Sequence, residues 1–396
     1  MRGMTQARGT ALLAVILTAA LVGAGCGDSK DSGGGGDSTQ AKGSGIRAGT
    51  GTRAETAATA GTAAGEAAGA PVTLDTNKTV GIINFLDGIE SADRLRDTTK
   101  AALEGLGYKT VLCDGAGDPA KMVACGNSLL DRGVDAIMED AIDPSLITSV
   151  IKKAQAKKVP IVQVGGATSE GLSGSYYPDE AKAGQVLSDY LLKQLATVPD
   201  KPADIAVHDF PAPWAKVRTD QLRAAVKNDP DVKITANTQT DSTNLVQGTR
   251  KTVADQLTQN PDLKAFWFAF DTAGQAGGPV ITAKYPGKEF PDRPLVATFH
   301  ADVGTTDIMR KGGIDVALDT NYDAAVWVGV DNLLEYWGRE KPFDTTPQPA
   351  YEGIGDGYSY TVITKDNLPA AGKYVEPEHD VPAYFQAKWK QEFGTP

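Results

Sequence analysis

The sequence predicts an α/β protein made of two doubly wound, Rossmann-like lobes. Residues 78–396 exceed the roughly 250 to 300 residues at which a single hydrophobic core stops growing, so two lobes are expected. From residue 79 onward, short apolar runs alternate with segments of helical period, which is typical of a parallel sheet covered by helices. The alternation occurs as two consecutive sets, one for each lobe.

The first set begins with the apolar run TVGIINF. Two of its helices end at glycines, Gly107 and Gly133, and two begin with Asp-Pro, a normal helix start. The expected strands are 79–85, 108–113, 134–140 and 159–166. The expected helices are 91–107, 118–133 and 143–158, followed by a long helix at about 179–196.

The second set repeats this order. Its expected strands are 203–210, 232–238, 263–270, 294–300 and 314–320. Its expected helices are about 214–228, 243–259, 273–284 and 324–338. Open α/β sheets bind ligands at the carboxyl ends of their strands, so the natural site is a cleft between the two lobes.

The N-terminal segment has the pattern of an export signal. Residues 1–8 carry two arginines and no acid, and the apolar run 11–22 is shorter than the roughly 20 residues that span a bilayer. The small residues that lead to Cys26 resemble a bacterial lipoprotein lipobox, although Gly23 stands where leucine is usual and Leu21 lies two residues further back. The resemblance implies a lipidated Cys26 and anchoring at the extracytoplasmic face of the cell membrane. The alternative is an ordinary secretory peptide.

Residues 27–77 are dominated by Gly, Ala, Thr and Ser, which predicts a disordered tether because such a segment buries too little apolar surface to offset its ordering entropy. The net charge is −11, and the sequence has no basic stripe, so nucleic acid is not an expected partner.

Two further cysteines, Cys113 and Cys125, lie at a strand end and in the following helix. Disulfides persist in exported proteins, so a disulfide between them is expected, with two free thiols as the alternative. A pair at this spacing with no nearby histidine is a poor metal site, so we expect no metal.

The order of several phrases resembles the type I periplasmic binding proteins of ABC transporters, in their sugar-binding, ribose-binding-protein-like branch. These phrases are Leu106-Gly107-Tyr108, RGVDAIMEDAIDPSLI with KKVPIVQV, KVRTDQLRAAV, NPDLKAFWFAFDTAGQAGG and VATFHADVGTTDIMRKGG. The resemblance implies two lobes joined by three crossovers and delivery of a small solute, a sugar or polyol first, to an ABC permease. A receptor that reports to a membrane signalling partner is the alternative.

Lobe boundaries follow from this resemblance. Signal peptide and tether occupy 1–26 and 27–77. The N-terminal lobe is expected to comprise 78–197 plus about 320–375, and the C-terminal lobe 198–319 plus about 376–396.

The candidate ligand residues lie just after strands or in first helical turns. They are Asp87, Glu90, Asp143, Gly166, Trp214, Arg218, Phe270, Asp271, His300 and Asn321. Arg218 and Asp271 match family positions. Gly165-Gly166 replaces an Asp-Arg pair, Phe270 replaces an Asn, and His300 replaces an Asp. Carboxylates outnumber the arginine in this set, which favours a neutral polyol or a cation over an anion.

Each candidate also has a local explanation. Asp143 and Asp271 can be helix caps, Arg218 a surface residue, Phe270 a core residue and His300 a loop residue.

Enzymatic patterns are absent from the sequence, which contains no G-x-S-x-G, H-E-x-x-H, Walker A or dinucleotide fingerprint in a folded segment. We therefore expect a binding protein without a cofactor, and a hydrolase is the minor alternative. The export signal stands where a regulator of this fold would carry its helix-turn-helix.

Overall fold

The computed structural model describes residues 71–396. The expected signal peptide, Cys26 and the tether up to residue 70 lie outside the described residues. Residues 71–77, which the sequence analysis includes in the tether, instead contact the first lobe. The amide of Val72 donates to the carbonyl of Glu392 over 2.9 Å, and Leu74 packs against the first core.

The first lobe contains a five-stranded parallel sheet in the order β2-β1-β3-β4-β5. Its strands are β1 (Thr79–Asn84), β2 (Lys109–Asp114), β3 (Ala136–Asp140), β4 (Ile161–Val164) and β5 (Gly174–Tyr176). One face is covered by α2 (Pro119–Asp131) and α3 (Thr148–Lys157), and the other by α1 (Glu90–Gly105) and α9 (Ala324–Arg339). Alternate side chains of β1, β3 and β4 enter the two cores, as expected of strands buried on both faces.

The second lobe contains a six-stranded sheet in the order β11-β10-β9-β8-β6-β7, in which only β11 (Thr361–Ile363) is antiparallel. The other strands are β6 (Ala203–Asp209), β7 (Val232–Gln239), β8 (Ala265–Phe268), β9 (Leu295–Phe299) and β10 (Val316–Asp319). One face is covered by α4 (Glu180–Leu195) and α5 (Pro213–Lys227). The other is covered by α6 (Leu245–Gln259), α7 (Asp271–Lys284) and α8 (Val303–Arg310). The expected fold class of two doubly wound lobes is confirmed.

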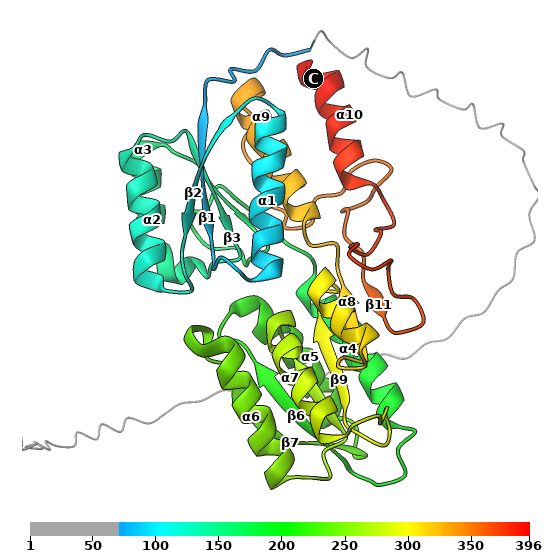
Figure 1. The fold of residues 1–396 in the computed structure, drawn as a ribbon. Helices are drawn as coiled ribbons and strands as arrows, with labels where there is room; N and C mark the ends of the chain where they lie inside the picture. The colour runs from blue at the N-terminus through cyan, green and yellow to red at the C-terminus, as the bar shows by residue number, and fades with distance from the viewer. Residues whose placement is uncertain (1–70) are drawn as a thin grey trace, which may run out of the picture. The chain divides into compact units, whose positions relative to one another are not determined.

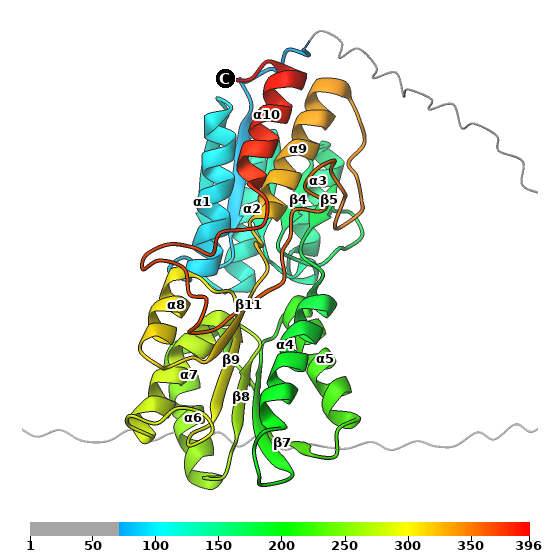
Figure 2. The same ribbon diagram turned by 90° about the vertical axis from the view of Figure 1, so that its right-hand side faces the viewer.

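The chain crosses between the lobes at residues 177–179, 320–323 and 359–360, and a fourth time at residues 364–380. The segment 364–380 then leaves β11 and returns to the first lobe, where α10 (Val381–Phe393) lies beside α1 and α9 (Figure 2). Phe385 and Trp389 of α10 enter the first core, and the Trp389 ring stacks on Trp327 of α9 at 5.6 Å.

Three boundaries drawn from the sequence therefore change. Residues 376–396 were expected in the C-terminal lobe, but α10 buries its apolar side chains in the N-terminal one. Residues up to 197 were expected in the N-terminal lobe, but α4 packs on the second sheet through Leu187 and Leu191. The range 320–375 was expected in the N-terminal lobe, but β11 pairs with β10 of the second.

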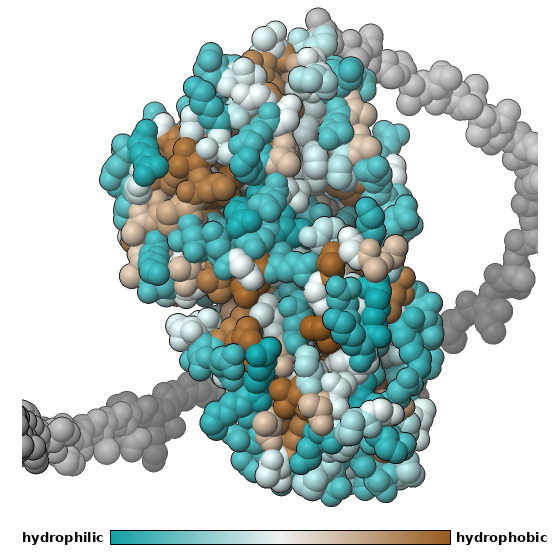
Figure 3. Space-filling view, in the orientation of Figure 1, coloured by the Kyte–Doolittle hydropathy of each residue, from teal (hydrophilic) through white to brown (hydrophobic). Residues whose placement is uncertain are grey.

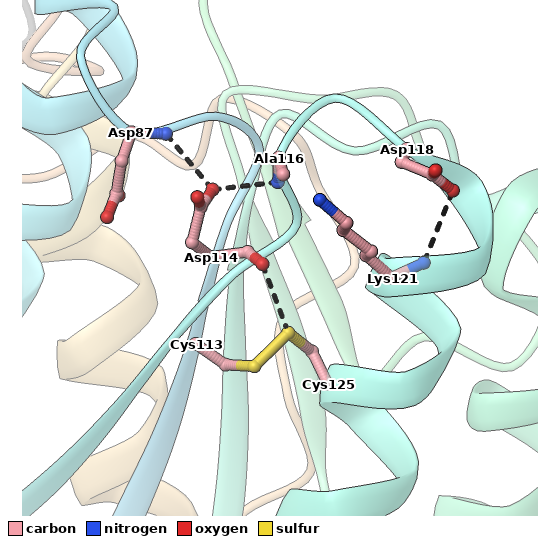
Figure 4. The surroundings of a disulfide bond; sticks show 7 residues. All are labelled: Asp87, Cys113, Asp114, Ala116, Asp118, Lys121 and Cys125. Carbon is pink, nitrogen blue, oxygen red and sulfur yellow. Dashed lines mark hydrogen bonds between the residues drawn. A yellow bond between two sulfur atoms is a disulfide. The ribbon is translucent and has the colours of Figure 1, made fainter. Parts of the chain in front are cut away.

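A disulfide joins Cys113 of β2 to Cys125 of α2, with 5.7 Å between the two Cα atoms (Figure 4). The helix begins beside it, where the carboxylate of Asp118 accepts hydrogen bonds from the amides of Ala120 and Lys121. The bond fixes α2 to the edge strand of the sheet. Near it, apolar side chains gather on the surface over β2, where Leu112 is 46% exposed (Figure 3).

Within residues 71–396, no helix has both the length and the hydropathy of a membrane span.

Candidate functional site

A cavity of about 40 Å³ lies where the two lobes meet, and it is partly open to solvent. Both lobes and two of the crossings contribute to its wall. The lining residues are Phe85, Ser91, Ala92, Leu95, Ala141 and Gly165 from the first lobe, Pro178 and Tyr322 from the crossings, and Glu180, Trp214, Arg218, Phe270 and His300 from the second. The carboxyl ends of β1, β3, β4, β8 and β9 lead into these positions, which is where an open α/β sheet holds a ligand.

Aromatic rings form one wall of the cavity. Phe210 stacks on Trp214 at 5.4 Å and lies 4.9 Å from Phe270, while Trp214 and Phe270 are 5.6 Å apart. Phe85 of the first lobe meets Phe210 edge to face at 6.2 Å. The contact brings apolar surfaces of both lobes together at the cavity.

Arg218 is almost fully buried at the base of the cavity, and its charge is matched inside the second lobe. Two of its nitrogens donate to the carboxylate of Glu180, which begins α4. Its other hydrogen bonds go to the carbonyl of Ala269 at 3.2 Å and to Nε2 of His300 at 3.0 Å, and the guanidinium lies 4.9 Å from the centre of the Trp214 ring. Burial raises the pKa of Glu180, whereas Arg218 lowers it by stabilising the carboxylate.

Arg94 of α1, in the first lobe, forms an ion pair with a carboxylate of the second lobe. Its guanidinium donates to Asp302 of the second lobe over 2.9 Å and to Asp323 at the start of α9 over 2.8 Å. The hydroxyl of Tyr322 also donates to Asp302 over 2.9 Å. Because Asp302 is fully buried, these donors replace the water that its carboxylate would otherwise bind.

Two weaker contacts also span the lobes. The hydroxyl of Ser91 donates to Asp271 over 3.3 Å, and the amide of Gly304 donates to the carboxylate of Glu90 over 2.8 Å. Burial raises the pKa of Asp271 to about 8, with a further contribution from the charge of Asp302. The Asp271 carboxyl is therefore mostly protonated at neutral pH.

His300 is neutral in this environment, because burial first and then the charges of Arg218 and Arg94 hold its pKa well below the ordinary value. A guanidinium can only donate, so Nε2 of His300 accepts from Arg218 and the proton resides on Nδ1.

Asp271, His300 and Asp302 are also the described residues that come nearest to a metal site, since one ligand atom from each lies within 4.8 Å of the others. Arg94 and Arg218 already donate to two of these three side chains. The guanidinium groups thus place positive charge where a metal cation would need to approach.

The comparisons with known proteins agree with this geometry. The family model of the periplasmic binding protein domain matches residues 80–341. The chain belongs to this family.

Curated relatives match over shorter stretches. The ribose import binding protein of Salmonella typhimurium is 26% identical over 101 residues, which is 25% of this chain and 34% of that protein. The Bacillus subtilis (strain 168) ribose import binding protein is 22% identical over 212 residues, covering 48% of this chain and 66% of the relative. The matches thus span between a third and two thirds of the relatives' lengths.

Solved structures match most of this periplasmic binding protein. One from Mycobacterium smegmatis in complex with β-D-fucofuranose has a TM-score of 0.62 at 16% identity, covering 79% of this chain and 98% of the other. An ABC transporter solute-binding protein from Agrobacterium vitis with bound allitol has a TM-score of 0.63 at 16% identity, covering 74% and 97%. At such identities the likeness establishes the fold.

Four residues proposed from the sequence line the cavity of this periplasmic binding protein: Trp214, Arg218, Phe270 and His300. Asp271 lies next to the cavity and is joined to it through Ser91, which is part of the wall. Glu90 contacts the second lobe outside the cavity.

The other four proposed residues lie outside the cavity lining, which corrects the expectation. Asp143 caps a short 3-10 helix (Pro144–Ile147) by accepting from the amide of Ser145. Asp87 is half exposed and pairs with Arg96. Gly166 leaves room for the side chain of Gln163, and Asn321 adopts a positive φ of 49° while donating to the carbonyl of Gly357.

Sequence reasoning missed Glu180, Tyr322 and Arg94. A weak signal existed for each of them. Glu180 begins the helix after the first crossing, Tyr322 lies within the second crossing, and Arg94 follows Glu90 by four residues on the same helical face.

Proposed function

We propose that this chain is an extracytoplasmic solute-binding protein that closes its two lobes on a small neutral solute and presents it to an ABC permease. The observation that carries the proposal is the cavity, whose wall combines side chains of both lobes and of two crossings. A ligand held there contacts both lobes at once only when they are closed, so binding shifts the population toward the closed form.

The proposed ligand class is a sugar or polyol derivative. It is suggested by the names of the relatives, which include ribose, galactofuranose and allitol binders. The paired charges of Arg218 and Glu180 support a neutral solute, because neither side chain is left to balance the charge of an ionic ligand.

Attachment to the membrane is a separate part of the proposal and rests on the sequence before residue 27. A lipid on Cys26, followed by the Gly- and Ser-rich segment, would hold the binding domain near a permease.

The experiment combines a thermal-shift screen with small-angle scattering. Both are measured on residues 71–396, and the full chain serves as the reference protein. A neutral solute that binds only the native state stabilises it by about 2.7 kcal/mol at 100 times its dissociation constant, and the radius of gyration should fall as the lobes close. Trp214→Ala in the second lobe and Phe85→Ala in the first should each weaken binding. Leu112→Ala, on the exposed edge strand, is the matched control.

The proposal fails if folded protein shows no shift and no compaction with any solute of a broad panel. It also fails if binding is insensitive to the variants from one of the two lobes. Either result would favour a receptor for a membrane partner.

A further inference from the structure

The composition of the cavity wall is unusual for a site that must hold a molecule rich in hydroxyl groups. Most of the lining side chains are apolar, including the faces of Phe85, Trp214 and Phe270. The polar ones are Ser91, Glu180, Arg218 and His300, with the hydroxyl of Tyr322.

The charged lining groups bind one another. The two oxygens of Glu180 accept from Arg218, whose other nitrogens donate to Ala269 and His300. This leaves no forked carboxylate or guanidinium on the described wall to grip two neighbouring hydroxyls, the arrangement that makes bidentate contacts strong. The hydroxyls of Ser91 and Tyr322 donate to Asp271 and Asp302.

The remaining hydrogen-bonding capacity consists mainly of donors. Within residues 71–396, the indole Nε1 of Trp214 and the Nδ1 of His300 are buried without a partner. Nδ1 carries the proton because Nε2 accepts from Arg218. Oδ2 of Asp271, also buried without a partner in the described chain, adds a third position beside His300.

A free pentose or hexose does not match these few unpartnered hydrogen-bonding groups. Each of its hydroxyls both donates and accepts, and a buried hydroxyl without partners costs about 1 to 3 kcal/mol by protein mutational data. A planar ring fits better, because its apolar surface packs against the exposed parts of Trp214 and Phe270 and its few acceptors are enough for the N–H groups that lack a partner.

We propose that the ligand of this cleft is an uncharged molecule that buries a planar aromatic or heteroaromatic ring against Trp214 and Phe270 and carries hydrogen-bond acceptors for the Trp214 and His300 N–H groups. The inference rests on the proposed function, since it assumes that the ligand lies between the lobes. It narrows the class from free sugars and polyols to ring-bearing derivatives such as aryl glycosides.

The test uses matched pairs of probes that differ by the ring: phenyl β-D-glucoside against glucose and adenosine against ribose, with indole as a ring alone. Affinities are measured by calorimetry on the full chain. The ring-bearing member should bind more tightly by a factor on the order of 70, because about 100 Å² of ring surface leaves water at about 25 cal/mol per Å².

Two variants locate the ring and its donor. Phe270→Leu keeps the wall apolar but removes a planar face, so it should reduce the preference for ring-bearing probes. Trp214→Phe keeps a face and removes the N–H, so it should weaken probes that carry an acceptor and leave indole unchanged. Trp337→Phe is the control, since its ring packs against Tyr108 in the first lobe.

The inference is overturned in three ways. Glucose or ribose could bind as tightly as its ring-bearing partner, which would leave the proposed function intact. Ring-bearing probes could bind with no response to Phe270→Leu and Trp214→Phe. Finally, none of the ring probes could bind to the folded protein. In that case, a solute of another class that lowers the radius of gyration would overturn the ring proposal and leave the proposed function standing. If no solute lowers the radius of gyration, the ring proposal and the proposed function both fail.

Discussion

Arg94 of α1 joins the two lobes through a buried ion pair, and its removal should separate closure from folding. The guanidinium lies 2.9 Å from Asp302 and 2.8 Å from Asp323, with Asp302 fully buried in the second lobe. In Arg94→Met the closed form would bury the Asp302 carboxylate with only the Tyr322 hydroxyl as its donor. Opening the lobes returns that carboxylate to water. The free-energy cost of burying it without Arg94 therefore destabilises only the closed form.

The magnitude follows from buried ion pairs in general. Removing one partner costs about 3 to 5 kcal/mol, and the remaining Tyr322 donor places this case at the lower end. About 3 kcal/mol against closure corresponds to a loss of ligand affinity on the order of 100-fold. Calorimetry with the tightest ligand from the matched pairs measures the affinity, and small-angle scattering measures the expected shift toward a larger radius of gyration.

Arg293 provides a matched control inside one lobe. It is buried and pairs with Asp315 through two contacts of 2.8 Å, and both residues belong to the second lobe. Arg293→Met should lower the melting temperature without a comparable change in affinity. The reasoning about Arg94 is refuted if both variants lose stability alike while ligand affinity stays at the wild-type value.

Four further predictions follow from the fold and the sequence. Because burial raises the pKa of Asp271 to about 8 from the ordinary 3.8, the native state retains a proton that the unfolded chain releases, so stability should fall as pH rises between about 4 and 8. Asp271→Asn should flatten this dependence in denaturant titrations. The double variant Cys113→Ser with Cys125→Ser should lose about 3 kcal/mol of unfolding free energy and no longer respond to reductant. Trp389→Ala, in the core beneath α10, should cost about 3 to 5 kcal/mol in chemical denaturation. Cys26→Ala should move the full chain from the membrane fraction to the soluble fraction on fractionation of producing cells.

Each of these has a result that counts against it. An unchanged pH slope in Asp271→Asn would assign the titration to another buried carboxylate, with Asp302 the nearest. If the melting temperature of the wild-type protein is the same with and without reductant, the disulfide does not stabilise the fold. A tolerated Trp389→Ala would contradict the placement of α10 in the first core, and a Cys26→Ala chain that stays with the membrane would contradict lipid anchoring.

The fold was largely accessible from the sequence, because both lobes follow a strong local rule. Apolar runs of four to eight residues alternate with segments of helical period, and several helices are marked by an Asp-Pro start or a glycine at the end; none of these signals depends on distant contacts. The lobe assignments of α4, β11 and α10 were not accessible in this way. Their amphipathic patterns show that each buries a face but not which sheet receives it.

The candidate site was accessible only in part, for a related reason. Open α/β sheets bind ligands at the carboxyl ends of their strands, and Trp214, Phe270 and His300, which were proposed on this rule, line the cavity. The rule does not determine which way a side chain points. Asp143 turns back to cap its own helix, and Asn321 stabilises a tight turn in the second crossing.

The two buried arginines show why residue type alone could not specify the ligand. From the sequence, Arg218 was a candidate ligand residue, with a surface residue as the alternative, yet in the structure it is buried and Glu180 of the same lobe neutralises its charge. Arg94 pairs with Asp323 at the start of α9 and also with Asp302 of the second lobe, and only the Asp302 contact depends on the lobes being together. Under the proposed function, Arg218 helps to shape a neutral cavity and the Arg94–Asp302 contact favours the closed form. Because neither arginine needs a charge on the ligand, the proposal leaves selectivity to the aromatic wall.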